Sequence, residues 1–195
     1  MNPWETRLRA SLSGPDLSAA LGPRPAPTGD NHPMPHSAKH GTEIAFEPEF
    51  IAGLRDIFEE KIVFNKLLGL KVVDLAPGRA TARIAMRPDL VGHYAYNRVH
   101  GGVISAGLDA MGGLAVMAAI GARHMDESPA ERLHRFAKLS TIDLRIDYLR
   151  PGVGDHFELR AEVMRLGSRV ASTRMEFLGP DGKLLSTGSG AYIVS

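Results

Sequence analysis

The longest apolar run in the chain extends from His100 to Gly121, and Asp109 is the only charged residue between Gly101 and Gly121. The run exceeds the ~18 apolar residues that suggest a membrane span. However, an aspartate lies near its centre and six glycines interrupt it, so we predict a buried central helix instead. A bare carboxylate inside an apolar helix is costly unless it is paired, which makes Asp109 a candidate for chemistry.

Two shorter patterns precede this run. Apolar residues recur at helical spacing from residue 48 to about residue 65 and predict an amphipathic helix; they are Phe50, Leu54, Ile57 and Phe58. Residues 70–75 and 80–86 then predict two strands around the turn Ala76-Pro77-Gly78. Residues 126–136, which follow the central helix, predict a polar helix or loop.

Beyond residue 140 the apolar period changes to two, which predicts strands. Four strands are expected, at 142–148, 157–163, 173–177 and about 183–194. Turn residues at 150–152, 167–168 and 179–182 predict that these four strands are successive antiparallel neighbours. A helix that is buried on most sides needs a sheet that curls around it. We therefore predict an α+β hotdog fold, a long central helix wrapped by a curved antiparallel sheet.

The beginning of the chain differs from the rest, because glycine and proline recur too often for a regular element. We expect residues 1–45 to be a disordered N-terminal extension and residues 46–195 to form the folded domain. Trp4, Leu8 and Leu12 have the spacing of a short amphipathic helix or a weak targeting signal. A histidine recurs every fourth residue from 32 to 40, but prolines at 33 and 35 forbid the helix that would align these side chains as metal ligands.

Composition excludes several classes of protein. The 195 residues carry a net charge of +1 without a dense basic run, so we expect no binding of nucleic acid. The absence of cysteine excludes disulfides, thiolate metal sites and a cysteine nucleophile. No apolar signal-peptide core follows Met1, and we expect a cytoplasmic protein that does not bind a membrane.

Specific motifs then point to a family. The triplet His100-Gly101-Gly102, an aspartate nine residues after the histidine, and the segment from Thr141 to Gly152 occur in this order. Residues 64–70 and 167–171 strengthen the match, which covers roughly residues 47–194. Together these motifs resemble the PaaI-like hotdog thioesterases, most closely their YigI-like medium/long-chain acyl-CoA branch. The resemblance implies hydrolysis of acyl-CoA, medium/long-chain or aryl, to free acid and coenzyme A, without a metal or organic cofactor.

The residues themselves suit this chemistry. Two glycines at a helix start expose backbone N–H groups, and the helix dipole adds positive potential there. Such a site can hold a thioester carbonyl and its developing oxyanion. The resemblance implies that Gly101 or Gly102 is the main donor, that His100 orients the carbonyl, and that Asp109 is a general base or a nucleophile. It also implies that Thr141 steadies the acid or the attacking water.

Helix geometry separates these groups. Asp109 lies eight residues after Gly101, or about 12 Å along a helix axis, so one chain cannot bring both to one thioester carbon. Two antiparallel helices across a twofold axis would bring Gly101 of one chain opposite Asp109 of the other. We therefore expect a homodimer, or a pair of such dimers.

The binding residues follow the family pattern less closely. Relatives carry an asparagine a few residues before the triplet, where this chain has His93, so His93 or Asn97 is the candidate second carbonyl donor. Candidate contacts to coenzyme A phosphates are the basic residues in or beside turns, Arg150, Arg165, Arg169 and Lys183. Met111, Met117 and Phe58 are candidates for the acyl tunnel.

Two other functions share these features. Hotdog hydratases and dehydratases have the same fold, although their catalytic histidine and acid occur in other sequence contexts. A non-catalytic acyl-CoA-binding module would account for the missing asparagine.

Overall fold

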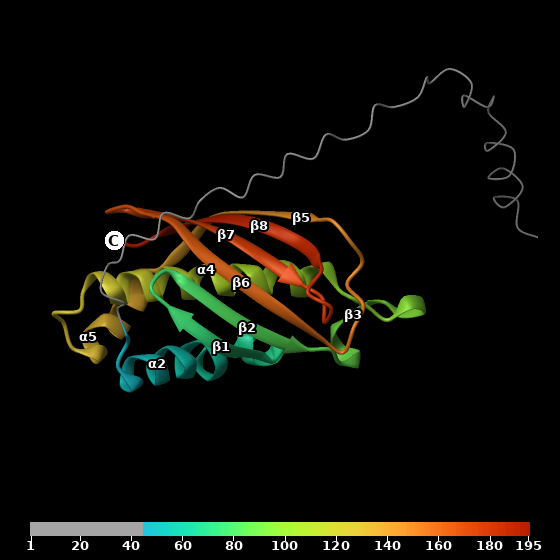
Figure 1. Cartoon of the computed structure of the whole chain (residues 1–195), viewed down its shortest axis with the longest axis horizontal. Coiled ribbons are helices and arrows are strands. Elements are labelled where there is room, and N and C mark those ends of the chain that lie inside the picture. Colours follow the sequence, from blue (N-terminus) through green and yellow to red (C-terminus); the bar gives the residue numbers. More distant parts are fainter. Residues whose placement is uncertain (1–44) are drawn as a thin grey trace, which may run out of the picture. The chain divides into compact units, whose positions relative to one another are not determined.

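A long helix, α4 (Gly101–Arg123), lies against a six-stranded antiparallel sheet, as Figure 1 shows. The predicted central helix and the hotdog arrangement are confirmed. This computed structural model describes residues 45–195, which belong to a unit that begins at Thr42. The predicted disordered extension, the helix near Trp4 and the histidine-proline segment lie outside the described residues.

The remaining elements follow the predicted order. The helices are α2 (Pro48–Arg55), the π-helix η2 (Asp56–Lys61), α3 (Val63–Leu68), α5 (Pro129–His134) and the 3-10 helices η3 (Pro88–Leu90), η4 (Tyr94–Tyr96) and η5 (Arg135–Lys138). The large sheet contains β1 (Leu70–Ala76), β2 (Arg79–Ala85), β5 (Ser140–Tyr148), β6 (His156–Leu166), β7 (Val170–Leu178) and β8 (Leu184–Ile193). A small hairpin, β3 (Val91–His93) and β4 (Arg98–Val99), forms where the sequence predicted only a loop.

α4 qualifies by length and composition as a membrane-spanning helix, and it is the one helix in residues 45–195 that does so. However, 72% of its most apolar 18-residue stretch is buried inside the fold. The sheet side of α4 faces β6, whose Phe157, Leu159 and Ala161 are buried. Close contact is possible because a Cβ on Gly107 would lie 2.7 Å from Leu159 Cδ2. α4 is therefore a core helix of this fold.

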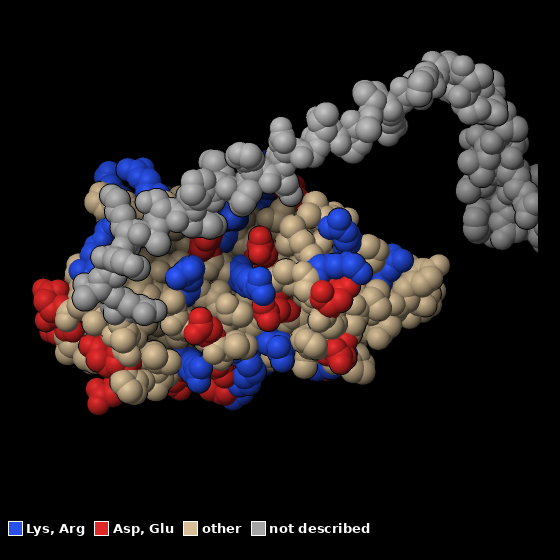
Figure 2. Space-filling model, viewed as in Figure 1, with Lys and Arg blue, Asp and Glu red and all other residues tan. Residues whose placement is uncertain are grey.

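The outer face of the sheet carries mixed charge. Lys and Arg side chains alternate with Asp and Glu over β1, β2 and β6 in Figure 2. Arg160 pairs with Glu158 at 2.6 Å, and Arg174 of β7 pairs with Glu162 at 3.1 Å. The alternation predicted for β6 is confirmed, with apolar side chains inward and charged side chains outward.

The strand order corrects one prediction. The sheet runs β1-β2-β6-β7-β8-β5, so β5 pairs with β8 and not with β6. Residues 150–152 reverse the chain but do not form a hairpin, because the segment after β5 crosses over to place β6 beside β2. The Gly152 carbonyl accepts a hydrogen bond from Val99 N–H of β4 on the way, at 2.9 Å. Turn residues specify a local reversal, whereas the pairing partner depends on which faces are buried together.

The two edges of the sheet differ. The β1 edge is covered by η2 and α2, because Glu59 Oε1 accepts a hydrogen bond from Val72 N–H at 2.9 Å and Arg55 donates to Val73 O at 3.4 Å. The β5 edge is open, and Ile142 and Tyr148, which the alternation places on an apolar face, are 53% and 55% exposed. Among residues 45–195, β5 thus presents an unpaired strand edge, and its apolar face is covered only in part, where Leu144 and Ile146 pack against the core.

The predicted amphipathic helix is interrupted. α2 and η2 continue one another, but Ile62 adopts an extended conformation (φ −76°, ψ 92°) and α3 begins after it. This break reorients the last turns, so that Asn65 and Leu68 are buried while Phe64 and Leu67 are exposed.

Candidate active site

The His100-Gly101-Gly102 triplet starts α4. His100 is the N-cap, and its Nδ1 accepts a hydrogen bond from Gly102 N–H at 2.8 Å. In the neutral ring the proton is therefore on Nε2, which remains a donor. The Gly101 N–H has no hydrogen-bond partner among residues 45–195. Of the two glycines, Gly101 therefore has the free backbone donor, at the positive end of the longest described helix.

The strand β5 supports this helix start. Tyr148 OH donates a hydrogen bond to the Gly101 carbonyl at 3.0 Å. On the other side, a Cβ on Gly92 would lie 2.6 Å from His100 Cα, so only glycine lets the β3 backbone approach this closely. The triplet is thus held from both sides by backbone and side-chain contacts.

The two candidates for a second carbonyl donor lie in the exposed β3–β4 hairpin. The His93 ring stacks with Tyr94 and lies 4.9 Å from the Tyr96 ring centroid. Asn97 has φ 47°, a left-handed conformation that asparagine tolerates better than most residues. Neither side chain forms a hydrogen bond within residues 45–195. The hairpin geometry accounts for Asn97 as a turn residue, and a donor role for either residue stays a prediction.

Asp109 lies on α4 with Thr141 of β5 beside it. Thr141 Oγ1 donates to Asp109 Oδ1 at 2.9 Å, and Tyr192 OH of β8 lies 3.3 Å from the same oxygen. The sequence suggested a carboxylate enclosed by an apolar helix, but the side chain is only half-buried because it opens into a pocket. Oδ2 accepts no hydrogen bond from the described residues. The two hydroxyl groups therefore orient the carboxylate and leave Oδ2 available.

Tyr192 was not predicted from the sequence. Its side chain is 1% exposed, and its hydroxyl also reaches the Asp109 backbone carbonyl at 3.1 Å. Burial raises the pKa of the Tyr192 hydroxyl above its usual range, and the neighbouring Asp109 carboxylate raises it further. Tyr192 therefore remains a neutral donor. Gly112 makes room for it: a Cβ there would have the Tyr192 hydroxyl as its nearest neighbour and Tyr192 Cζ at 2.7 Å.

The pocket beside Asp109 has a volume of about 250 Å³. Its wall is mostly apolar and comes from η2, α3, α4, η5 and β5: Phe58, Ile62, Phe64, Asn65, Ala106, Asp109, Ala110, Gly113, Phe136, Leu139, Ser140, Thr141 and Tyr192. Phe58 lines this pocket as predicted. Met111 and Met117 do not, because both are fully buried in the core.

A second pocket, of about 350 Å³, holds the other half of the predicted site. It is lined by His100 and Gly102 together with Leu67, Leu90 and Val103, and it shares Phe64 with the Asp109 pocket. Within one chain the helix start and the carboxylate therefore face different pockets on either side of an exposed phenylalanine.

The predicted coenzyme A contacts are scattered. Arg150 follows β5, donates to Leu184 O at 2.8 Å and shares a cavity of about 490 Å³ with Lys183. Arg165 and Arg169 lie near the β6–β7 turn. Arg123, at the C-terminal end of α4, donates a hydrogen bond to the Leu166 carbonyl of this turn, so the turn lies at the end of α4 opposite to His100. The structure therefore separates Arg150 and Lys183 from the other two arginines.

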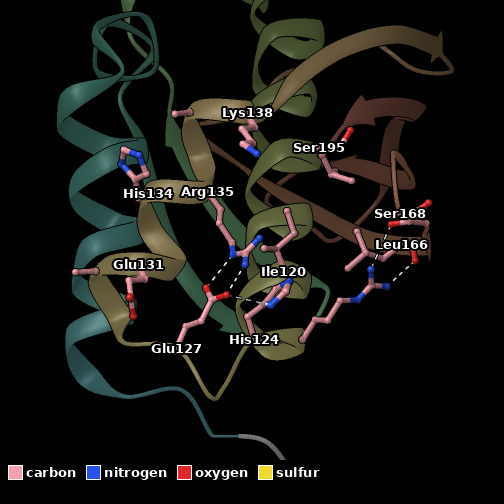
Figure 3. A pocket seen from close by; sticks show the side chains of 15 residues that line it. Ile120, His124, Glu127, Glu131, His134, Arg135, Lys138, Leu166, Ser168 and Ser195 are labelled. Atoms are coloured by element: carbon pink, nitrogen blue, oxygen red, sulfur yellow. Dashed lines mark hydrogen bonds and ion pairs between the residues drawn. The ribbon is translucent and has the colours of Figure 1, made fainter.

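Another cavity, of about 860 Å³, lies at the C-terminal end of α4 and contains none of the predicted catalytic residues (Figure 3). In its wall, Glu127 pairs with Arg135 and His124, and Arg123 binds the Leu166 and Gly167 carbonyls. In residues 45–195, no three His, Asp or Glu side chains gather in a way that would hold a metal ion.

Comparisons with known proteins point to one family. The family model described as the thioesterase superfamily matches residues 96–186. The medium/long-chain acyl-CoA thioesterase YigI of Salmonella typhimurium is 34% identical over 139 residues, which cover 71% of this chain and 90% of that protein. YigI of Escherichia coli K12 is 32% identical with the same coverage.

Solved structures give the same result. A Shewanella oneidensis protein related to the thioesterase superfamily has 35% identity and a TM-score of 0.70, with 77% of this chain and all (100%) of that chain covered. A mutant structure of the phenylacetic acid degradation protein PaaI from Thermus thermophilus has 30% identity and a TM-score of 0.53, covering 68% of this chain and 99% of that one. These matches show that the chain belongs to the thioesterase superfamily.

Proposed function

We propose that this protein hydrolyses medium/long-chain acyl-CoA thioesters to the free acid and coenzyme A. The observation that carries the proposal is the Asp109 carboxylate, which two hydroxyl groups orient at an apolar pocket while Oδ2 stays free. The names of the YigI relatives supply the acyl-CoA substrate class. We also propose a cytoplasmic location, with which a sequence that contains no cysteine is compatible.

The proposed reaction uses both groups of predicted site residues, those at the start of α4 and Asp109. The thioester carbonyl accepts a hydrogen bond from the free Gly101 N–H, and His100 Nε2–H is the second donor beside it. Asp109 Oδ2 either takes a proton from the attacking water or attacks the carbonyl carbon itself. In both routes the C–S bond breaks, coenzyme A leaves as the thiol, and one water is consumed. A single turnover in ¹⁸O-water that labels the Asp109 carboxylate would establish the nucleophilic route, because a general base gains no oxygen from water.

We further propose that each active site combines two chains. Gly101 and Asp109 are separated by about 12 Å along α4. Asp109 lines one pocket, whereas His100 and Gly102, on either side of Gly101, line the other. The unpaired edge of β5 is available for pairing with a strand of a partner chain. Exposed apolar residues, including Phe64 (57% exposed) and Leu67 (62% exposed), lie beside both pockets. A twofold axis at this edge would bring Gly101 of one chain to Asp109 of the other.

The first experiment measures thiol release from acyl-CoAs of increasing chain length, with hydration of an enoyl-CoA as a parallel assay. We expect thiol release, and Asp109→Asn should lower kcat by about 10²–10⁴ while the protein still folds. Hydration without thiol release would indicate a hydratase, and binding without turnover would indicate a non-catalytic module. A fully active Asp109→Asn variant would refute the proposed role of the carboxylate.

The second experiment tests the shared site by complementation. Gly101→Pro removes the backbone donor at a position where proline fits, because His100 is extended (ψ 137°) and Gly101 is the first helical residue. Homodimers of Gly101→Pro and of Asp109→Asn should both be inactive. A mixed dimer contains one site with both original groups, so about half the wild-type activity should return. Isolated mixed dimers that stay inactive would refute the shared site.

A further inference from the structure

Asn65 carries a buried amide that no part of the described fold satisfies. The residue lies in α3 and is 4% exposed. Its Nδ2 has no hydrogen-bond partner among residues 45–195. Leaving a buried polar group unpaired costs about 1–3 kcal/mol, and such groups are rare enough in folded proteins that each one needs an explanation.

The position of Asn65 supplies that explanation. Side chains with a buried, unpartnered nitrogen or oxygen within residues 45–195 are Asn65, Arg98, Arg132 and Ser186. Of these, only Asn65 lines the pocket that contains Asp109. The polar side chains that share this wall are Asp109, Ser140, Thr141 and Tyr192, and the remaining lining is apolar. The buried Asn65 amide therefore lies in the wall of the pocket that would hold the acyl chain.

The catalytic machinery does not use this amide. Asp109 Oδ1 is already bound by Thr141 and Tyr192, and Asn65 hydrogen-bonds to none of these three residues. Of the carbonyl donors proposed above, His100 lines the other pocket and Gly101 does not line the Asp109 pocket. The Asn65 amide therefore has no partner within residues 45–195, and an acyl group bound in this pocket can supply one.

We propose that Asn65 is a specificity-determining residue, which donates a hydrogen bond to a hydroxyl or keto oxygen of the acyl chain. This inference rests on the proposed thioesterase function. Asn65 and Asp109 share one small pocket, and Asp109 must lie beside the thioester, so the oxygen is on the part of the chain close to the thioester. The pocket selects 3-hydroxyacyl or 3-oxoacyl groups over plain acyl groups of equal length, because a plain chain leaves the buried amide unpaired.

The test compares octanoyl-CoA, 3-hydroxyoctanoyl-CoA and 3-oxooctanoyl-CoA by thiol release. The wild-type enzyme should favour at least one oxygenated substrate in kcat/KM by about tenfold or more, the lower range for a lost hydrogen bond to a buried group. Asn65→Leu, which has a similar volume, should reduce that preference to within about threefold of unity, mainly by gaining activity on octanoyl-CoA. Leu139→Val, an apolar change in the same wall, is the matched control and should keep the preference.

Three results would overturn the assignment. A wild-type enzyme that cleaves all three substrates equally shows that the pocket does not recognise the hydroxyl or keto oxygen of the acyl chain. An Asn65→Leu enzyme that loses the same factor on every substrate shows that Asn65 acts on the thioester common to them. An Asn65→Leu enzyme that folds, by melting temperature, and keeps the wild-type preference shows that another group reads the oxygen. Failure to release thiol from any acyl-CoA is distinct from these results, because it refutes the thioesterase function and this inference with it.

Discussion

Gly112 allows the sharpest test of how Asp109 is supported, because its neighbour Gly113 provides a matched control. Both glycines are buried in the middle of α4. A Cβ on Gly112 would meet the Tyr192 hydroxyl first, then Tyr192 Cζ at 2.7 Å and Met175 Sδ at 2.9 Å. A Cβ on Gly113 would meet only Leu139 at 3.5 Å and Phe58 at 3.9 Å, which are ordinary contacts.

The magnitudes follow from these contacts. In Gly112→Ala, overpacking costs about 1–3 kcal/mol, and displacement of the Tyr192 hydroxyl from Asp109 removes a hydrogen bond of about 0.5–1.5 kcal/mol. Replacing glycine in a helix returns about 1 kcal/mol. The free energy of unfolding should therefore fall by about 1–3 kcal/mol. Gly113→Ala gains the higher helix propensity of alanine without a steric clash, so its free energy of unfolding should rise by up to about 1 kcal/mol.

Urea unfolding measures both variants, and steady-state hydrolysis measures Gly112→Ala. We expect its kcat to fall together with its stability, because Asp109 Oδ1 loses one of two donors. In a double-mutant cycle, Tyr192→Phe removes the hydroxyl that clashes, so the double variant should be less destabilised than the sum of the single changes. If Gly112→Ala is as stable as Gly113→Ala, or if the two changes are additive, the contact between Gly112 and Tyr192 does not carry the effect.

Two further predictions concern hydrogen bonds to carboxylates. Thr141→Val should lower kcat by about tenfold with little change in KM, because Asp109 loses the hydrogen-bond donor at 2.9 Å. An unchanged kcat would show that Thr141 has only a structural role in β5. The hydrogen bond from Arg132 and a backbone hydrogen bond lower the pKa of Glu47, so this pair stabilises the fold above the ordinary carboxyl pKa and is lost as pH falls through the lowered value. Melting temperatures of wild type and Glu47→Gln should therefore converge in acid, and a constant difference would contradict this.

The elements whose signals are local were predictable from the sequence. α4 was predicted because its apolar run is long and because the glycines and His100 occur at its start. β6 was predicted because Phe157, Leu159 and Ala161 alternate with charged residues, and this period of two is a property of any extended strand. The helix start and Asp109 were predicted as site residues because a triplet and a fixed spacing are visible along the chain.

The residues that hold Asp109 in place could not be predicted in the same way. Tyr192 is 83 residues from Asp109 in the sequence, and nothing in its own segment indicates that its hydroxyl reaches a carboxylate. The requirement for glycine at 112 depends on that contact. In the sequence, Asn65 was only part of the motif at residues 64–70. Its place in the wall of the Asp109 pocket depends on the break in the helix at Ile62.

The order of the strands shows the same division. The turn at residues 150–152 was visible, yet β5 pairs with β8 at the sheet edge and not with β6. Periodicity and turn chemistry act over a few residues, so the sequence by itself determined α4 with its start and the six strands of the large sheet, but not the β3–β4 hairpin or the break at Ile62. Strand pairing and hydroxyl contacts join segments that are far apart in the chain, and only the burial of their faces around α4 decided which of them meet.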